Sequence, residues 1–426
     1  AYALKTGFSS NKKNNMKHKN YIYVLAWAFT ILIAWWIIPS LVKKMTDAPN
    51  GYPLMYYSAR IKDLCIIDFR NVKDSFQDAH GNVYPRSQYD SLLPILNARQ
   101  LMMEGTMPDS IDGHAMDMKE MRVKQVMFRY RPTDMQTTQP PMGVLLEAMP
   151  KRGKLSLPGD YFRLTDRIVF VDAETNAVNE EKTIRFNEEL IKKGFVFPAK
   201  GFWGNPSTRK AYEEGYFCLD SKNCLFHMKM VNGRPFIKNT HVSDSLQVRW
   251  FVMNEAADKR HYGFVFGTRG EAGIIEEHEG GYNFRRMDIR PVDLEKDQIS
   301  VLGNLLYWTV TLTNDDGMDS YGLDREALNR LASYHQERKR VLWDEVSEWI
   351  FPCYLSFSDT NNDFVGFYWE KGAWKAFVLQ FILAVGVCLV NTFVYHRHRS
   401  WVEALCVFVC GIPAIIAWIL LPDWRK

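Results

Sequence analysis

The chain has 426 residues, which is enough for more than one domain. Its formal net charge at pH 7 is +4, too small an excess of positive charge to indicate a nucleic-acid partner. Three segments are strongly apolar, and the sequence between them is ordinary soluble sequence. We therefore expect a membrane-anchored protein with a large water-exposed part.

The first apolar segment, residues 21–42, contains no charged residue over 22 positions. A helix of that length can cross a hydrocarbon core of about 30 Å at 1.5 Å per residue. No small-residue cleavage site is visible at its end, so we predict an uncleaved membrane helix and not a removed signal peptide. The lysine-rich residues 1–20 are predicted to form a cytoplasmic tail.

Residues 43–125 are expected to form a membrane-proximal cap of mixed helix and strand. The strand-like run IKDLCIIDFRNV begins at Ile61. A helical pattern follows over Gln88–Glu104, and Pro94 within it predicts a late start or a kink. This helix interrupts the β-rich pattern that dominates the following residues.

A methionine-rich stretch of the cap provides a metal-site hypothesis. Ten of the 18 methionines fall between residues 102 and 149. The run HAMDMKEM places His114, Met116, Met118 and Met121 close together. Thioethers with an imidazole suit Cu(I), but methionine is also a common core filler. The sequence therefore leaves copper binding and core packing as alternatives.

Residues 126–323 contain a degenerate repeat of short strands and tight turns. Similar units begin at Ile168, Tyr216, Tyr262 and Leu306, at offsets of 48, 46 and 44 residues. A period of roughly 40–50 residues built from short strands is typical of β-propeller blades. The repeat carries no Trp-Asp signature, so stacked meanders or a sandwich remain alternatives to a propeller-like fold.

Residues 324–372 are predicted to form a long helix and a juxtamembrane connector. Asp324 is a suitable N-cap, and apolar residues between Leu328 and Ile350 recur at roughly helical spacing. A helix of about 26 residues would be about 39 Å long.

Two further apolar segments, residues 373–395 and 401–422, are predicted to form an antiparallel pair of membrane helices. A short cytoplasmic loop at 396–400 joins them, and residues 423–426 form a tail. Gln380 and Asn391 lie eleven residues apart and therefore share one face of the helix predicted over residues 373–395. Polar residues on one stripe within a membrane indicate a helix–helix interface, either with the third helix of this chain or with another subunit.

The distribution of basic residues suggests the orientation. Lysines precede the first apolar segment, and Arg397 and Arg399 occupy the short loop. By the positive-inside rule, we expect the N-terminus inside and residues 46–372 outside. In a bacterium with two membranes, the large domain would lie in the periplasm and the helices in the inner membrane.

Four of the seven cysteines lie outside the predicted membrane helices, namely Cys65, Cys218, Cys224 and Cys353. Cys218 and Cys224 flank a five-residue loop, which makes a cross-strand disulfide plausible. Cys65 and Cys353 each lie about 20 residues from a membrane segment, where a bridge would close the base of the domain. Buried free thiols are an equally acceptable alternative.

Catalytic motifs are not evident in the sequence. It contains no Walker A motif, no G-x-S-x-G and no H-E-x-x-H, and its ten histidines form no metal-spaced pair in the large domain. We therefore predict a protein that is not an enzyme and uses no cofactor.

Several stretches resemble a known family. These are VDAETNAVNEEKTIRF, GFVFPA, GNPSTRKAYEEGYF and LFHMKMVNGRPF, which lie between Val171 and Phe236. They are similar to Bacteroides-type membrane proteins known only as a domain of unknown function. The resemblance extends from about Met16 to the end of the chain and implies no catalytic residues. It implies instead an association with ABC-type transporter components.

Together these observations predict a membrane-anchored α+β chain with one N-terminal helix, a large β-rich domain and a C-terminal two-helix hairpin. The expected function is that of a non-catalytic periplasmic subunit of an ABC-type transport complex, whose outer domain binds cargo or a periplasmic partner. The expected partners are membrane lipid, an ABC permease and a nucleotide-binding subunit, with no nucleic acid. An envelope copper-binding or sensing protein is the alternative.

Overall fold

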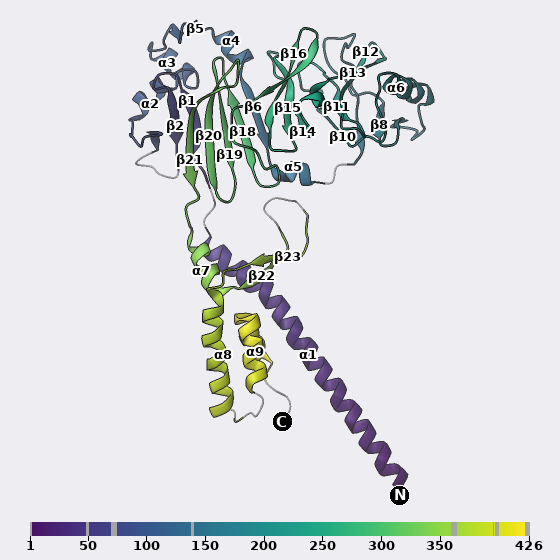
Figure 1. Cartoon of the computed structure of the whole chain (residues 1–426), viewed down its shortest axis with the longest axis vertical. Helices are drawn as coiled ribbons and strands as arrows, with labels where there is room; N and C mark the ends of the chain where they lie inside the picture. Colours follow the sequence, from purple (N-terminus) through teal and green to yellow (C-terminus); the bar gives the residue numbers. More distant parts are fainter. Residues whose placement is uncertain are drawn as a thin grey trace. The chain divides into compact units, whose positions relative to one another are not determined.

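The computed structural model (Figure 1) describes residues 2–47, 51–69, 75–137, 140–358, 364–394, 396 and 400–421, with side chains for all of these except residues 2–20 and 400. The chain divides into two compact units. One unit is Tyr52–Arg338, and the other combines Ala1–Gly51 with Lys339–Lys426. Of the predicted loop at 396–400 only the two end residues are described, and the predicted tail 423–426 lies outside the described residues.

The unit formed by the two ends of the chain is mainly helical. Its helices are α1 (Tyr2–Thr46), α7 (Leu342–Ile350), α8 (Ala376–Phe393), α9 (Ser400–Cys410) and α10 (Ile412–Leu420), and its strands β22 (Cys353–Ser356) and β23 (Tyr368–Lys371) form a hairpin. Two helical stretches among the described residues, Tyr21–Thr46 and Ala376–Phe393, are long and apolar enough to cross a membrane. This length and composition suggest membrane association.

The third apolar segment is interrupted, which differs from the predicted continuous helix over 401–422. Gly411 separates α9 from α10 and adopts φ 66° and ψ −143°, a conformation that essentially requires glycine. Pro413 follows within the first turn of α10, where its missing N–H is tolerated. The interruption therefore follows directly from the sequence Cys-Gly-Ile-Pro.

Besides the two-stranded pair β4–β5 (Ser110–Ile111 and His114–Ala115), the described part of the Tyr52–Arg338 unit contains five antiparallel sheets of three or more strands, which we number by their order in space. Sheet I contains β1 (Leu54–Ser58), β2 (Asp63–Ile67) and β3 (Phe76–Asp78). Sheet II contains β6 (Val126–Tyr130), β18 (Gln298–Gly303), β19 (Tyr307–Thr313), β20 (Gly317–Asp324) and β21 (Arg330–Glu337). Sheet III contains β14 (Val248–Met253), β15 (His261–Gly267), β16 (Ala272–His278) and β17 (Gly281–Arg286).

Sheet IV contains β10 (Gly201–Gly204), β11 (Tyr216–Leu219), β12 (Leu225–Val231) and β13 (Arg234–Asn239), and sheet V contains β7 (Met142–Gly143), β8 (Asp160–Leu164) and β9 (Ile168–Asp172). Helix α6 (Glu180–Lys192) packs beside β9. The shorter elements are α2 (Arg86–Leu92), α3 (Ala98–Met103), β4 (Ser110–Ile111), β5 (His114–Ala115), α4 (Met118–Val123), α5 (Pro132–Gln136) and η1 (Val242–Asp244).

Aromatic side chains fill the layers between successive sheets. The Phe128 and Phe264 rings stack between sheets II and III with centroids 3.9 Å apart. The same layer contains Trp308, a fully buried side chain. Phe217 stacks on Phe251 between sheets III and IV at 4.5 Å. Buried apolar clusters also join sheet I to sheet II and sheet IV to sheet V. Burial of these rings is the main stabilisation of the stack.

The predicted repeat corresponds to these meanders, but a closed propeller is not found. The units expected at Tyr216 and Tyr262 are the second strands of sheets IV and III, namely β11 and β15, and the unit at Leu306 is the middle strand of sheet II, β19. The unit at Ile168 is instead the last strand of the three-stranded sheet V. Sheets I and V lie at opposite ends of an open stack (Figure 1).

The long helix predicted from Asp324 is wrong. Asp324 ends β20, and its carboxylate accepts hydrogen bonds from the backbone N–H groups of Ala327 and Asn329, which closes a turn. The chain then continues as the edge strand β21 over Arg330–Glu337. Among the described residues of the 324–372 segment, helix is found only at Leu342–Ile350. The helical spacing of the apolar residues was misleading, because the segment pairs with β20 and this tertiary contact decides its conformation.

The helix predicted over Gln88–Glu104 is divided into α2 and α3. Leu93 and Pro94 lie between the two helices, so the proline coincides with a complete break where a late start or a kink was predicted. The predicted boundaries at 125 and 323 both fall inside the Tyr52–Arg338 unit, because β6 pairs with β18 in sheet II.

Two buried histidines make the fold sensitive to acid. His227 stacks on Phe217, bonds to the Tyr282 hydroxyl at 2.7 Å, and has its pKa lowered by burial to about 3. Burial likewise lowers the pKa of His261 to about 4. Both histidines have pKa values below the ordinary value of 6.5, so the unfolded chain takes up protons more readily than the folded chain. The free energy of unfolding therefore keeps its full value above pH 6.5 and falls as the pH drops through 6.5. At pH 5.5 each neutral histidine should reduce the unfolding free energy by about 1.4 kcal/mol.

This sensitivity can be measured as the difference in unfolding free energy of the full chain between pH 7.5 and pH 5.5. His227→Gln should remove about half of the histidine contribution, and the exposed control His278→Gln should leave the difference unchanged. Burial raises the pKa of Glu213 to about 6 and gives a smaller opposite slope, so the comparison between variants is decisive. Equal slopes for wild type and His227→Gln would contradict the assignment.

Candidate functional site

Four sheets present their first strands to one cavity in the Tyr52–Arg338 unit. Strands β6, β7, β10 and β14 are the terminal strands of sheets II, V, IV and III, so each has one edge without a partner strand within the sheets as described. The cavity beside them has a volume of about 1030 Å³, which is large for a small-molecule site. Its lining includes Arg129 from β6, Met142 from β7, Trp203 from β10 and Trp250 from β14.

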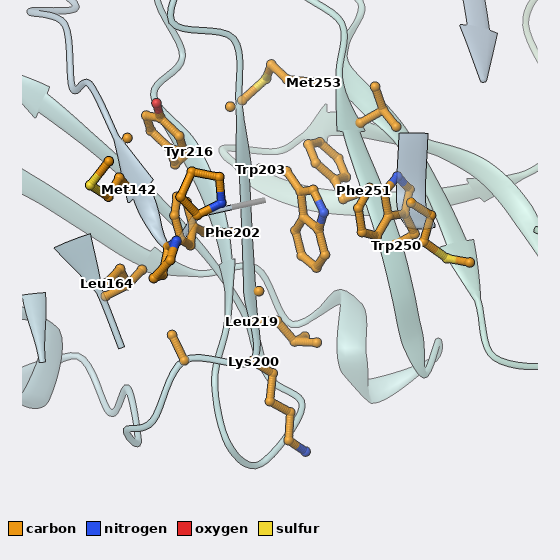
Figure 2. A pocket seen from close by; sticks show the side chains of 18 of the residues that line it. Met142, Leu164, Lys200, Phe202, Trp203, Tyr216, Leu219, Trp250, Phe251 and Met253 are labelled. Atoms are coloured by element: carbon orange, nitrogen blue, oxygen red, sulfur yellow. The ribbon is translucent and has the colours of Figure 1, made fainter. Parts of the chain in front are cut away.

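The cavity extends around both faces of sheet IV at strand β10. Phe202 packs with the core between sheets IV and V, whereas Trp203 packs with the core between sheets III and IV. Opposite orientation of neighbouring side chains is expected in a strand, yet both residues line the cavity. Figure 2 shows the Trp203 indole between Phe202 on one side and Phe251 on the other. The open edge of β10 is therefore the centre of the site.

Glycines leave room for aromatic rings beside strands β10 and β7. A Cβ atom at Gly204 would lie 2.5 Å from the Tyr216 ring, and one at Gly201 would lie 2.9 Å from the Trp203 ring. At Gly143 in β7, a Cβ would lie 2.6 Å from Phe162. Distances below 3.0 Å cannot be accommodated without movement. Aromatic rings therefore occupy the space beside these glycines, where any side chain would collide with them.

The Tyr216 side chain is one of the connections between sheet IV and the segment that follows β7 at the cavity wall. The Tyr216 hydroxyl accepts a hydrogen bond from the N–H of Val144 and donates one to the Val144 carbonyl, both at 3.1 Å. Its ring packs edge-on against Phe162 at 5.0 Å. Burial raises the pKa of Tyr216, so the hydroxyl remains protonated and can serve as both donor and acceptor.

The charged groups of the lining are mainly cationic. Among the described lining residues the charged side chains are Arg129, Lys200, Arg249 and Asp134. Arg249 pairs with Glu295 at 2.6 Å, and Lys200 donates to the Asn223 side chain at 2.6 Å. Arg129 is exposed and has no ion-pair partner among the described residues. The Asp134 carboxylate accepts the backbone N–H of Arg131 at the start of α5, which is a helix-capping role.

A buried ion triad fixes the segments that follow β10 and β14. Lys210 Nζ lies 2.8 Å from a Glu213 oxygen and 2.7 Å from a Glu255 oxygen, and all three side chains are almost fully buried. Glu255 also accepts hydrogen bonds from the Glu214 N–H and the Asn205 amide. Burial raises the pKa of both carboxyl groups, to about 6 for Glu213. The triad thus holds the ends of two edge strands at a fixed separation.

The methionine cluster lies away from this cavity. Met121 is buried, and Met116 and Met118 pack against the same small apolar cluster, which includes Leu305. His114 is exposed on β5. The structure therefore brings the three thioethers together in a packed environment, and the proposed copper ligands remain a prediction.

Neither predicted disulfide is present among the described residues, where all seven cysteines are free thiols. Cys218 lies opposite Phe226 in the β11–β12 register, whereas Cys224 lies in the turn beyond. This two-residue offset corresponds to a diagonal separation of about 7–8 Å, too long for a disulfide. Cys65 is fully buried in sheet I, and Cys353 belongs to the other unit.

The predicted polar stripe faces the third apolar segment of the same chain. Asn391 is fully buried, and its amide donates to Glu403 on α9 at 2.6 Å. Gln380 is 1% exposed, and its amide lies close to Gly411. A Cβ atom added at Gly411 would be only 2.6 Å from this amide. Both residues therefore occupy the interface between α8 and the interrupted α9–α10 segment. A small residue at a contact between helices lets the two backbones approach closely.

This packing predicts that Gly411 cannot accept a side chain. Gly411→Ala should lower hairpin stability by about 1–3 kcal/mol, because the new Cβ meets the Gln380 amide and the backbone conformation is strained. Adding Gln380→Ala to this variant should restore only the part of the lost stability that comes from the contact between the new Cβ atom and the Gln380 amide. The measurement is unfolding of the full chain by SDS in mixed micelles.

Gly386 in α8 is a matched control, because a Cβ there meets nothing within 4 Å and alanine favours a helix. Gly386→Ala should leave stability unchanged or raise it slightly. If both glycine substitutions had the same effect, the close contact at Gly411 would be contradicted.

The geometry defines a class of protein: an open stack of antiparallel meanders whose inner strand edges surround an aromatic cavity. The family described as "Domain of unknown function (DUF4857)" matches residues 54–323, more than half of the chain. The chain belongs to this family. Comparison with curated proteins gives no match.

Among solved structures, a similar chain is "Dihydro-heme d1 dehydrogenase NirN in complex with DHE". It is 8% identical, the match covers 67% of this chain and 84% of that chain, and the TM-score is 0.19. So low a TM-score supports no argument about fold or function.

Proposed function

We propose that the protein is a membrane-anchored binding protein whose Tyr52–Arg338 unit holds its ligand in the cavity beside β6, β7, β10 and β14. The observation that carries this proposal is the combination of a cavity of about 1030 Å³ with aromatic walls and strand edges that have no partner strand within the described sheets. Aromatic side chains provide large apolar contact areas, and free backbone groups provide hydrogen bonds that fix orientation. The charged lining groups described above serve ion pairs, hydrogen bonds or helix capping, except for Arg129.

Anchoring is supported by the two apolar helices of the other unit. Tyr21–Thr46 and Ala376–Phe393 each have the length and composition of a membrane helix. Basic residues before the first helix favour placement of the N-terminus in the cytoplasm, with the binding unit in the periplasm.

Binding in the cavity should depend on the Trp203 indole. In full-length protein reconstituted in lipid nanodiscs, Trp203→Ala should weaken binding of the dye 1-anilinonaphthalene-8-sulfonate about tenfold, because the ring forms the central wall. The measurement is a fluorescence titration with empty nanodiscs as the baseline. Trp349→Ala removes an exposed tryptophan of α7 and should leave the affinity unchanged. Equal loss in both variants, or no loss in either, would refute the cavity as the binding site.

We further propose that the binding unit serves an ABC-type transport complex and delivers cargo or contacts a periplasmic partner. This rests on the family resemblance and on the membrane hairpin. Purification of the tagged chain in mild detergent should recover a permease and a nucleotide-binding subunit, identified by mass spectrometry. Deletion of residues 377–426 should alter their ATP hydrolysis. A chain that purifies alone and monodisperse would count against the transport assignment while leaving ligand binding intact.

A further inference from the structure

We infer that the ligand of the cavity is an extended peptide segment that adds as a strand to the free edge of β10. This inference rests on the proposed binding function and specifies its ligand class. Such strand addition uses main-chain hydrogen bonds for affinity and alternate side-chain pockets for specificity. The partner would be an extended, mainly apolar segment of another protein.

The pattern of lining residues shows that the cavity borders an edge of sheet IV. All nine residues of Pro198–Pro206 line the cavity, including the whole of β10. A strand that turned one face to a cavity would contribute every second residue, because neighbouring side chains point to opposite faces. Consecutive residues are expected only where the strand edge itself borders the space. The run Arg249–Met253 in β14 shows the same pattern.

The edge of β10 offers backbone hydrogen bonds of the right kind. Within its sheet β10 pairs with β11 alone, in the register Gly201↔Leu219 to Gly204↔Tyr216. In an antiparallel pair, alternate N–H and C=O groups of an edge strand point away from the partner. The four residues of β10 extend about 13 Å at 3.3 Å per residue, so they match about four residues of an added strand.

Side-chain sites lie on both faces of the position that an added strand would occupy. On the sheet V side, the lining includes Phe202, Leu164 and the Tyr216 ring. On the sheet III side, it includes Trp203 and Leu219. An added strand alternates its side chains between these two sides, so both should be apolar or aromatic. A small compact ligand would fill one side only and leave the backbone edge unused.

The charge of the cavity lining indicates which type of residue flanks the apolar stretch of the peptide ligand. Three cationic side chains and one carboxylate border the cavity among the described residues, and Arg129 is the cation with no described partner. An acidic residue beside the apolar stretch would pair with it. The expected ligand therefore has apolar residues along its extended part and an acidic residue at one flank.

The test uses the full chain in nanodiscs and a phage-displayed library of random 12-residue peptides. Enriched sequences should contain consecutive apolar residues with an acidic flank, and a fluorescently labelled synthetic copy should bind in a polarisation assay. Two further copies carry N-methyl groups on alternate residues, one on the odd and one on the even positions. One of them should lose at least tenfold in affinity while the other retains it, because only alternate N–H groups face β10.

Trp203→Ala should weaken the peptide at least tenfold, and Trp203→Leu, which preserves apolar volume, should weaken it less. Trp349→Ala should have no effect. The inference is overturned if no peptide is enriched over the Trp203→Ala protein, or if both methylated copies bind like the parent. If the fluorescent dye still binds in a Trp203-dependent manner in that case, the cavity remains a binding site and only the peptide assignment fails.

Discussion

A strand at the edge of a sheet leaves half of its backbone hydrogen-bonding groups without a partner, and this constraint determines the arrangement of the binding unit. Sheets II, III, IV and V each end in such a strand at the same cavity. A closed ring of sheets would surround these edges completely. Here sheets I and V lie at opposite ends of the stack, so the edges remain beside an accessible cavity. The unpaired backbone groups must then be satisfied by water or by a ligand.

Polar contacts between sheets set the distances among these edges. The Lys210 triad connects the segments after β10 and β14, and Arg325 performs the equivalent role between sheets II and III. The Arg325 guanidinium pairs with Asp258 and donates to the carbonyls of Lys124 and Asn304 at 3.1 and 3.0 Å. Such buried contacts add little net stability but penalise any change in spacing. A cavity held in this way is preorganised, which reduces the ordering that a ligand would otherwise impose.

The sequence predicted the meanders well because their signals are local. Short apolar runs joined by turns such as Asn232–Gly233 recur at a nearly constant step, and each run became a strand. The segment after Asp324 was mispredicted because a capping residue followed by spaced apolar residues fits both a helix and a turn followed by an edge strand. Only pairing with β20, which is a tertiary contact, decides between them.

The cavity itself could not be predicted from local patterns. Its strands contain only two to six residues, and its walls come from four sheets that are distant in sequence. One signal was available in Gly201–Gly204, where two glycines flank two large aromatic residues. Glycine inside a strand often marks a close approach of another group. The apolar helices of the C-terminal segment, in contrast, depend on composition alone and were predicted except for the interruption at Gly411.

The position of sheet I has a consequence for how the chain is made. Its strands end at Asp78, yet its apolar face is covered by β19–β21, which begin at Tyr307. Tyr57 is tied to this distant partner by its N–H, which donates to the Thr309 hydroxyl at 2.9 Å. Strand β6 likewise cannot pair until β18 has been synthesised. Sheets V, IV and III can form in the order of synthesis, whereas the first strands to emerge must remain exposed until nearly the whole unit has been translated. The earliest part of the domain is therefore its last to be completed, and during that interval it is the part in need of chaperone protection.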